Sequence, residues 1–270
     1  MKATVLIDNI AKDKLKGEWG LSIFIHHEDK RILLDSGAGE SFAHNAKALS
    51  VPLEKVNFGV LSHAHYDHAD GMEKFFNINS KAKFYLSSEC KENCYGKRWI
   101  FSKYIGIKKG VMEKYKDRIV YVKGDKVISN GVSIISHKTK GLEAMGKKDG
   151  LCIKENSKLR FDNFAHEQSL VIDTDKGLVI FNSCCHGGAD TVITEVQKSY
   201  PNKKIYALVG GFHLYKSTDE EVKALAERIK KTGIEKIYTG HCTGKKAFEI
   251  LKKELGEKAE QLYVGLVIEA

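Results

Sequence analysis

One short segment of the chain carries four side chains of the types that bind metal ions: His63, His65, Asp67 and His68. In an extended loop, successive side chains point to opposite sides, so His63, His65 and Asp67 are expected to project together. His68 follows directly, where the chain is expected to turn into a helix. Imidazole and carboxylate groups suit zinc, which takes nitrogen and oxygen ligands near tetrahedral geometry. The spacing therefore predicts a loop that supplies two metal ions.

The alternative interpretation of this segment is a histidine-rich surface loop, or buried histidines that bind backbone groups. A single histidine would favour that alternative, but four ligand-type residues directly after an apolar strand favour a metal site. Three further histidines each follow an expected strand and lie close to glycine: His186, His213 and His241. Taken singly, each is as compatible with packing as with metal binding, although glycine-flanked strand ends are where sites gather.

Short strands and helices are expected around these residues. Strands are predicted at 4–7, 21–25, 31–34, 58–61, 84–86, 119–122, 126–128, 132–135, 169–172, 178–181, 205–209 and 236–238. Helices are predicted at 41–49, 190–199, 219–230 and 245–255. Segments 90–116 and 138–164 lack clear periodicity, and the second is interpreted as a functional loop or a mobile cover. The chain begins mainly with strands and continues with strands mixed with helices. This order favours a sandwich of two sheets with helices on the outside.

Composition limits the classes of protein that the chain can represent. A length of 270 residues with 42% hydrophobic and 29% charged residues is typical of a globular protein and argues against disorder. The net charge of +9 is spread along the chain, which favours a solvated lysine-rich surface over a nucleic-acid surface. The 6 cysteines are irregularly spaced and expected to be reduced. No run is apolar enough for a membrane span or a signal peptide, so no membrane contact and a cytoplasmic location are expected.

The segment from His63 to His68 resembles the His-x-His-x-Asp-His motif of the metallo-β-lactamase superfamily. This resemblance implies the α/β (α+β) class, with a single domain over 1–270. It also implies an αββα sandwich of two mixed β-sheets, with helices on the outer faces and the metal ions at one edge. Asp35, in Leu33-Leu34-Asp35-Ser36-Gly37, resembles the aspartate that orients the metal loop in this family, although a plain turn aspartate is the alternative. His65 stands where the flavodiiron branch has glutamate, which favours hydrolysis over reduction of oxygen or nitric oxide.

Three downstream segments resemble one branch of the superfamily, related to 7,8-dihydropterin-6-methyl-4-(β-D-ribofuranosyl)-aminobenzene-5′-phosphate synthase. They are 164–170, 210–214 and 239–244, and the resemblance extends over 8–265. The branch usually has Gly-Cys-Ser-His at 183–186, and other members of the superfamily place a bridging aspartate there. The resemblance favours His186 and His241 as further metal ligands and His213 as a substrate contact. Whether Cys184 binds metal stays open.

The expected function is that of a metal-dependent hydrolase with two zinc ions per chain, iron or manganese being alternatives. Asp67 would bind metal and orient the attacking water, which metal ions activate. The branch and the positive charge indicate a small anionic ester or phosphate-containing, pterin-related substrate. A phosphodiesterase or nuclease, or a non-catalytic metal-containing sensor, is the alternative, although the chain has no focused basic stripe for nucleic acid. Oligomeric state stays open.

The segment 138–164 adds one further expectation. It contains Lys147 and Lys148, and it directly precedes the hairpin that leads to His186. As a mobile cover it would present these lysines to an anionic substrate. A surface insertion without a role is the alternative.

Overall fold

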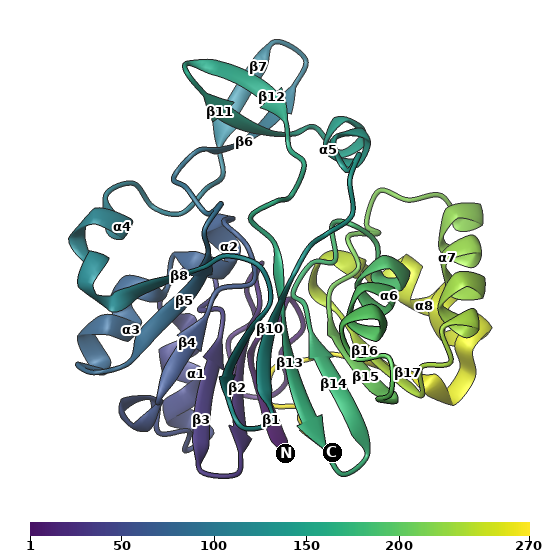
Figure 1. Ribbon diagram of the computed structural model, residues 1–270, viewed down its shortest axis with the longest axis horizontal. Helices are drawn as coiled ribbons and strands as arrows, with labels where there is room; N and C mark the ends of the chain where they lie inside the picture. Colours follow the sequence, from purple (N-terminus) through teal and green to yellow (C-terminus); the bar gives the residue numbers. More distant parts are fainter.

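The computed structural model describes residues 1–270. Two large sheets face each other, and helices cover both outer sides (Figure 1). The first sheet has the order β18-β1-β2-β3-β4-β5-β8. Its strands are β1 (Lys2–Ile7), β2 (Ser22–His27), β3 (Lys30–Leu34), β4 (Phe58–Val60), β5 (Lys83–Ser87), β8 (Ile119–Val122) and β18 (Val267–Glu269). Strands β3, β4, β5 and β8 pair in parallel, so the loops that follow β3 and β4 leave the sheet at the same edge.

The second sheet has the order β17-β16-β15-β14-β13-β10-β9. Its strands are β9 (Lys126–Ser129), β10 (Val132–Ser136), β13 (Gln168–Thr174), β14 (Gly177–Phe181), β15 (Ile205–Gly210), β16 (Lys236–Thr239) and β17 (Ala259–Gln261). Strands β14 to β17 are parallel, whereas β9, β10, β13 and β14 pair antiparallel. The loops after β14, β15 and β16 carry the three downstream histidines, and parallel pairing gathers them at one edge.

The chain forms eight α-helices, most of which flank the two sheets on opposite sides. They are α1 (Ser41–Ala48), α2 (Tyr66–Ala69), α3 (Met72–Ile78), α4 (Val111–Lys114), α5 (Glu143–Asp149), α6 (Ala189–Ser199), α7 (Asp219–Lys231) and α8 (Lys245–Leu255). Short 3₁₀ turns occur at Leu53–Lys55, Lys116–Arg118, His241–Thr243 and Gly256–Lys258. Helix α7 shows why these segments are helical. Thr218 and Glu221 form a capping box, and the buried side chains recur at helical spacing, at Val222, Leu225 and Ile229.

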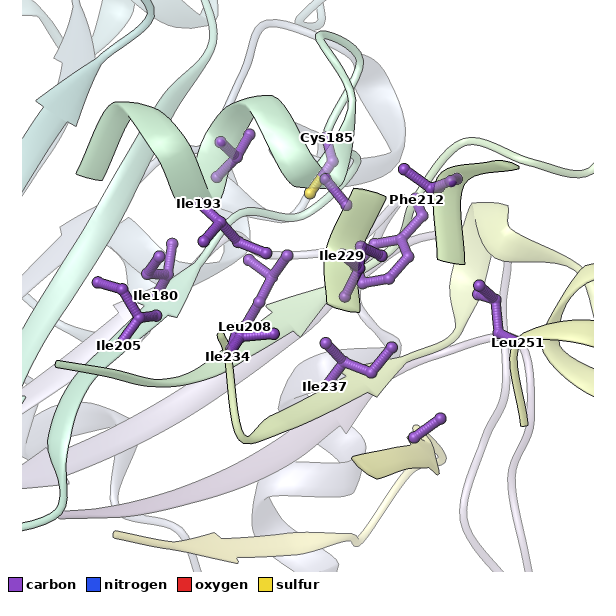
Figure 2. Packing of buried hydrophobic residues seen from close by; sticks show 14 of the residues in the cluster. Ile180, Cys185, Ile193, Ile205, Leu208, Phe212, Ile229, Ile234, Ile237 and Leu251 are labelled. Carbon is purple, nitrogen blue, oxygen red and sulfur yellow. The ribbon is translucent and has the colours of Figure 1, made fainter. Parts of the chain in front are cut away.

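Three hydrophobic clusters separate the layers. One lies between the two sheets and includes Val5 and Val60 from the first sheet and Val179 from the second. Another fills the space between the first sheet and its helices. The third packs α6, α7 and α8 against the second sheet (Figure 2). The predicted αββα arrangement of two mixed sheets is therefore confirmed, while the single-domain interpretation of 1–270 stays a prediction.

The two segments without periodicity are where the prediction from sequence is wrong. They form a third, four-stranded antiparallel sheet of order β12-β11-β6-β7, hereafter the cap sheet. Its strands are β6 (Cys94–Arg98), β7 (Phe101–Tyr104), β11 (Leu151–Glu155) and β12 (Lys158–Phe161). The pairing of β6 with β11 joins segments more than fifty residues apart, which local pattern cannot reveal. The cap sheet projects beyond one end of the sandwich, with α5 beside it (Figure 1).

None of the helices combines the length and the apolar character that a membrane span requires.

Candidate metal centre

The loop after β4 supplies the first four candidate ligands, and the structure corrects one detail of its expected shape. The chain stays extended through His65, but Asp67 and His68 already belong to helix α2. The alternation that was expected to carry Asp67 to the same side as His63 therefore stops at His65. As a result His63 and His65 face one group of residues, while Asp67 and His68 face another.

The first group consists of His63, His65 and His186. One ring nitrogen from each lies within 4.8 Å of the others. The ring centroids are 4.7 Å apart for His63 and His65, and 5.0 and 5.1 Å from His186 to His63 and His65. His186 comes from the loop after β14, so this group joins the two sheets at their common edge. Phe164 stacks on the His186 ring at 4.5 Å and holds it in place.

The second group consists of Asp67, His68 and His241. The Asp67 Oδ2 atom lies 3.6 Å from His68 Nε2 and 3.4 Å from His241 Nε2. The rings of His63 and His68 are 4.2 Å apart, so the two groups adjoin. The six residues of both groups are hereafter the histidine edge. Sequence analysis selected all six, and the structure brings all six together.

Several imidazole nitrogens of the histidine edge are buried without a hydrogen-bond partner. They are His63 Nε2, His65 Nε2, both ring nitrogens of His186, and His241 Nε2. Buried polar atoms almost always find a partner, because losing water without replacement costs about 1–3 kcal/mol each. Convergent, unpartnered imidazole nitrogens beside a carboxylate are the donor set that zinc, iron or manganese accepts. The residues present therefore fit a metal centre.

Electrostatics differ between the two groups. Burial and the neighbouring His68 and His65 imidazoles hold the pKa of His63 well below its usual value. Burial likewise lowers the pKa of His65 to about 3. In the second group, burial opposes ionisation of Asp67, but His68 and His241 outweigh it and hold the pKa of the carboxyl well below its usual value. The first group therefore offers neutral imidazoles, and the second offers a carboxylate.

Asp35 lies behind the second group. Its Oδ2 atom is 2.8 Å from His68 Nδ1, and its carboxylate accepts hydrogen bonds from the backbone N–H and the hydroxyl of Ser62. Ser183, in the loop after β14, donates to the same carboxylate at 2.5 Å. Asp35 thus links the loop after β3, the metal loop and the loop after β14. These contacts fit the orienting role that the resemblance implies, which stays a prediction for metal binding.

The N-terminal strand holds His241 in a similar way. Asp8 Oδ2 accepts the backbone N–H of His241 at 2.9 Å. Asn9 Oδ1 lies 3.1 Å from His241 Nδ1, and its amide donates to the His241 carbonyl. These contacts leave His241 Nε2 directed at Asp67. Sequence analysis missed Asp8 and Asn9, because nothing local connects them with a residue more than 200 positions away.

A second buried histidine, His137, lies behind the loop that carries His186. Its Nδ1 atom is 2.7 Å from Glu195 Oε2, and its Nε2 atom contacts Glu167 Oε2. Glu167 also accepts the backbone N–H of His186 at 3.1 Å. The three side chains of His137, Glu167 and Glu195 are hereafter the His137 cluster. This cluster holds the His186 loop, and sequence analysis did not predict it.

His166 anchors the metal loop from the opposite side. Its Nδ1 atom accepts the backbone N–H of Ala64, which lies between His63 and His65, and its Nε2 atom is 3.0 Å from Asp162. Both ring nitrogens of His166 therefore have partners. This pairing distinguishes His166 from His63, His65, His186 and His241, each of which has a ring nitrogen without a partner.

Cys184 takes the position between the two groups. Its Sγ atom lies 3.3 Å from His68 Nε2. It also forms compact sets of candidate ligands with His63 and His68, and with His186 and His213. This position is compatible with metal binding by the thiol, and whether Cys184 is a ligand stays a prediction to be tested.

The backbone is strained around the site. Asp35, Cys185, His213 and His241 all have positive φ angles, between 46° and 54°. Non-glycine residues seldom adopt this conformation, and it persists where the surrounding structure enforces it, often at functional sites. Gly71 meets a different constraint, a close backbone approach, since a Cβ atom there would collide with the Ser36 carbonyl. The loops of the site are thus held in shapes that free chains avoid.

A pocket of about 400 Å³ opens onto the histidine edge. Its aromatic lining comprises Trp19, Tyr66, Phe101 and Tyr215, and its basic lining comprises Lys97, Arg98, Lys103 and Lys216. Strands β6 and β7 of the cap sheet contribute several of these residues. Sequence analysis could not have found them, because their role depends on the unexpected cap sheet.

Of the residues predicted to contact the substrate, His213 lines the pocket, whereas Lys147 and Lys148 do not. His213 lines the pocket beside His186, with ring centroids 4.4 Å apart, and lies 3.4 Å from the Asp149 carboxylate. Lys147 and Lys148 belong to helix α5 and do not line this pocket. Lys148 instead pairs with Glu221 at 2.7 Å. The expectation that 138–164 lacks regular structure is wrong, because α5, β11 and β12 order this segment, while its role as a cover stays a prediction.

Comparison with known proteins agrees with this geometry. The family model described as the metallo-beta-lactamase superfamily matches residues 20–147. The chain is 29% identical over 267 residues to 7,8-dihydropterin-6-methyl-4-(beta-D-ribofuranosyl)-aminobenzene-5'-phosphate synthase of Methanocaldococcus jannaschii, covering 92% of this chain and 89% of that protein. An uncharacterized protein of the same organism is 26% identical over 254 residues, covering 92% of this chain and 93% of that protein.

Solved structures show the same fold. The structure of Tm1679, described as a metal-dependent hydrolase of the beta-lactamase superfamily, has a TM-score of 0.85 and 27% identity, covering 100% of this chain and 99% of that one. Zinc-bound PqqB from Methylobacterium extorquens shares the fold with a TM-score of 0.61 and 9% identity, each chain being covered completely. The chain has the metallo-β-lactamase fold, and its residues 20–147 match the model of the metallo-beta-lactamase superfamily. Within it, the chain resembles the branch of the dihydropterin-linked phosphate synthase.

Proposed function

We propose that this chain is a metal-dependent hydrolase of a small anionic ester, with up to two divalent metal ions at the histidine edge. One observation carries the proposal: buried imidazole nitrogens without partners, from loops of both sheets, converge in two adjoining groups, one of which contains the Asp67 carboxylate. His63, His65 and His186 would hold one ion, and Asp67, His68 and His241 would hold the other. When bound, such ions activate water and polarise the ester oxygen.

Other roles in the proposed reaction fall to side chains of the pocket and of the loops behind it. Asp67 would orient the attacking water, because its carboxylate lies between His68 and His241 at the floor of the pocket. His213 lines the same pocket and would contact the substrate. Asp35 and Asp8 would keep His68 and His241 in register through the hydrogen bonds described above.

The pocket supports an anionic substrate that carries a planar ring. Lys97 and Lys103 are exposed on the cap sheet and have no carboxylate partner, so their charges are free to meet an anion. Trp19 and Tyr215 form an edge-to-face pair at 5.6 Å and offer an aromatic wall. The similar synthase is named for a pterin-linked ribofuranosyl-aminobenzene phosphate, which combines a planar ring with a phosphate. A pterin-related phosphate is the finer form of the proposal.

A substrate panel tests the proposal. Metal-free protein and protein reloaded with zinc, manganese or ferrous iron are assayed on an aryl phosphomonoester, an aryl phosphodiester, a neutral aryl ester and a lactone. We expect turnover only after reloading, with a preference for an anionic ester. No turnover of any substrate with any metal would instead support the sensor alternative.

A pair of lysine variants tests the substrate class. Lys97→Ala with Lys103→Ala should raise KM for the anionic ester several-fold and leave KM for the neutral ester unchanged. Lys147→Ala with Lys148→Ala is the matched control, because it removes two lysines that do not line the pocket. Equal effects of the two double variants would contradict a specific anion contact on the cap sheet.

A further inference from the structure

Two cysteine thiols touch at the floor of the pocket. Cys184 follows β14 and Cys242 follows β16, yet their Sγ atoms are only 3.4 Å apart. Both line the pocket, and both are nearly buried, with exposed fractions of 3% and 1%. The geometry points to a redox-active pair: we propose that Cys184 and Cys242 close to a disulfide when the metal-free protein meets a small oxidant such as hydrogen peroxide.

The backbone around Cys242 is built to place its sulfur beside Cys184. The backbone N–H of His213 donates to Cys242 Sγ at 3.2 Å. Gly211 packs directly against this sulfur, and a Cβ atom at Gly211 would collide with it. The Gly211 N–H donates to the Ser183 carbonyl at 2.8 Å, which ties the two loops together. The contact between the sulfurs therefore follows from packing of three adjacent loops.

Closure needs only a small movement. A disulfide bond is about 2.05 Å long, so the two sulfurs must approach by about 1.4 Å from their separation of 3.4 Å. Rotation about side-chain torsions can supply a shift of this size. Neither sulfur is already committed to a disulfide, since all six cysteines are free.

The Cys184 sulfur also faces the candidate metal centre. Cys184 Sγ lies 3.3 Å from His68 Nε2, and the ligand atoms of Cys184, His241 and Cys242 lie within 4.8 Å of one another. A metal ion beside His68 and a disulfide at Cys184 would therefore compete for one sulfur. This part of the inference rests on the proposed metal centre, whereas the disulfide itself does not.

The oxidation balances with hydrogen peroxide as the named oxidant. One thiol sulfur attacks the peroxide, so an S–O bond forms, the O–O bond breaks and one water leaves. The second thiol then attacks the oxidised sulfur, so the S–S bond forms, the S–O bond breaks and a second water leaves. The two sulfurs lose two electrons in total, and peroxide is reduced to two waters.

Peptide mapping of the full-length chain tests the inference. Metal-free protein is treated with hydrogen peroxide, and the free thiols are counted before and after. We expect a loss of two of the six thiols, a cross-linked peptide that joins Cys184 with Cys242, and full reversal by dithiothreitol. A cross-link between other cysteines, or oxidation to sulfinic acid without a cross-link, would overturn the proposal.

Matched variants and a zinc-loaded sample sharpen the result. Cys184→Ser and Cys242→Ser should each abolish the loss of the thiol pair. Cys185→Ser should leave it unchanged, because Cys185 points into the hydrophobic cluster of α6 and α7 (Figure 2). With the metal centre as proposed, saturation with zinc should slow the oxidation at least tenfold. Equal rates with and without zinc would count against metal binding beside Cys184 and would leave the disulfide established.

Discussion

The His137 cluster and the histidine edge meet at the loop that carries His186, and they differ in whether their histidine ring nitrogens have hydrogen-bond partners. In the His137 cluster, both nitrogens of His137 contact carboxylates, one from Glu167 and one from Glu195. In the histidine edge, His63, His65, His186 and His241 have nitrogens without any partner. Satisfied buried polar groups stabilise a fold, whereas unsatisfied ones cost free energy and persist where a ligand completes them. This difference indicates that the His137 cluster stabilises the fold, whereas the histidine edge is the candidate binding site.

Removing two ligands from the histidine edge should have the largest functional effect. We expect His63→Ala with His65→Ala to lose most bound metal and to lower kcat/KM about a thousandfold, since metal ions contribute several kcal/mol to such catalysis. Metal content is measured by elemental analysis after dialysis, and activity with the anionic ester. His44→Ala, at an exposed histidine, is the control. Equal metal content in the double variant and the wild-type protein would contradict the assignment of the histidine edge as the metal site.

Removing the cation from the His137 cluster should instead act on stability. His137→Ala leaves Glu167 and Glu195 buried without their shared partner, with side chains 0% and 8% exposed. Loss of one member of a buried ion pair costs about 3–5 kcal/mol. Urea denaturation of metal-free protein measures this change in the free energy of unfolding. A loss below about 1 kcal/mol, the size typical of an exposed pair, would show that the cluster is not a scaffold.

Asp35 has features of both regions. Its carboxylate has hydrogen-bond partners, like those of the His137 cluster, and it contacts His68, a candidate ligand of the histidine edge. Asp35→Asn weakens the contact with His68 Nδ1 and should lower metal affinity about 10- to 100-fold. Competition with a chelator measures the affinity. Asp29→Asn, at an exposed aspartate that pairs only with its neighbour Lys30, is the matched control. An affinity equal to that of the control would remove the proposed role of Asp35.

The pH dependence of stability should report the His137 cluster. Burial disfavours the charged form of His137, but Glu167 and Glu195 outweigh burial and raise its pKa from 6.5 to about 10. Burial also opposes ionisation of Glu195, but His137 and the hydrogen bond from Thr139 outweigh it and lower its pKa from 4.5 to about 2. The histidine contribution is complete below pH 6.5 and is lost as pH rises through 10. The glutamate contribution is complete above pH 4.5 and is lost as pH falls towards 2.

Both contributions are therefore complete between pH 4.5 and 6.5, where the cluster should stabilise the fold most. Urea denaturation of metal-free wild type and His137→Ala, at pH values within this range and on both sides of it, measures the difference in the free energy of unfolding. The gap between the two proteins should narrow towards both acid and alkali. A gap independent of pH would mean that His137 acts through packing alone.

Much of the sandwich and of the histidine edge could be predicted from the sequence, for identifiable reasons. The candidate ligands His63, His65, Asp67 and His68 lie within six consecutive positions, and His186 and His241 each follow an apolar strand and lie close to glycine. Parallel strands deliver such loops to one edge, so local pattern suffices to gather them. The burial period likewise made helices such as α7 recognisable.

The parts that were missed depend on contacts between distant segments. The cap sheet needs β6 to pair with β11, and neither strand shows the alternation of a half-buried strand. Asp8, Glu167 and Glu195 act through side-chain hydrogen bonds to residues that are not their neighbours in the sequence. The break in alternation after His65 arises because helix α2 begins at Tyr66, a boundary without a clear capping residue.

Elemental analysis of the wild-type protein after extended dialysis tests the central claim most directly. The unpartnered nitrogens of the histidine edge predict close to two equivalents of divalent metal per chain in zinc-reloaded protein, and the same stoichiometry in the His44→Ala control. Protein that retains no metal after reloading, yet keeps its fold by circular dichroism, would contradict the account, because buried imidazoles would then be satisfied by something other than a metal ion.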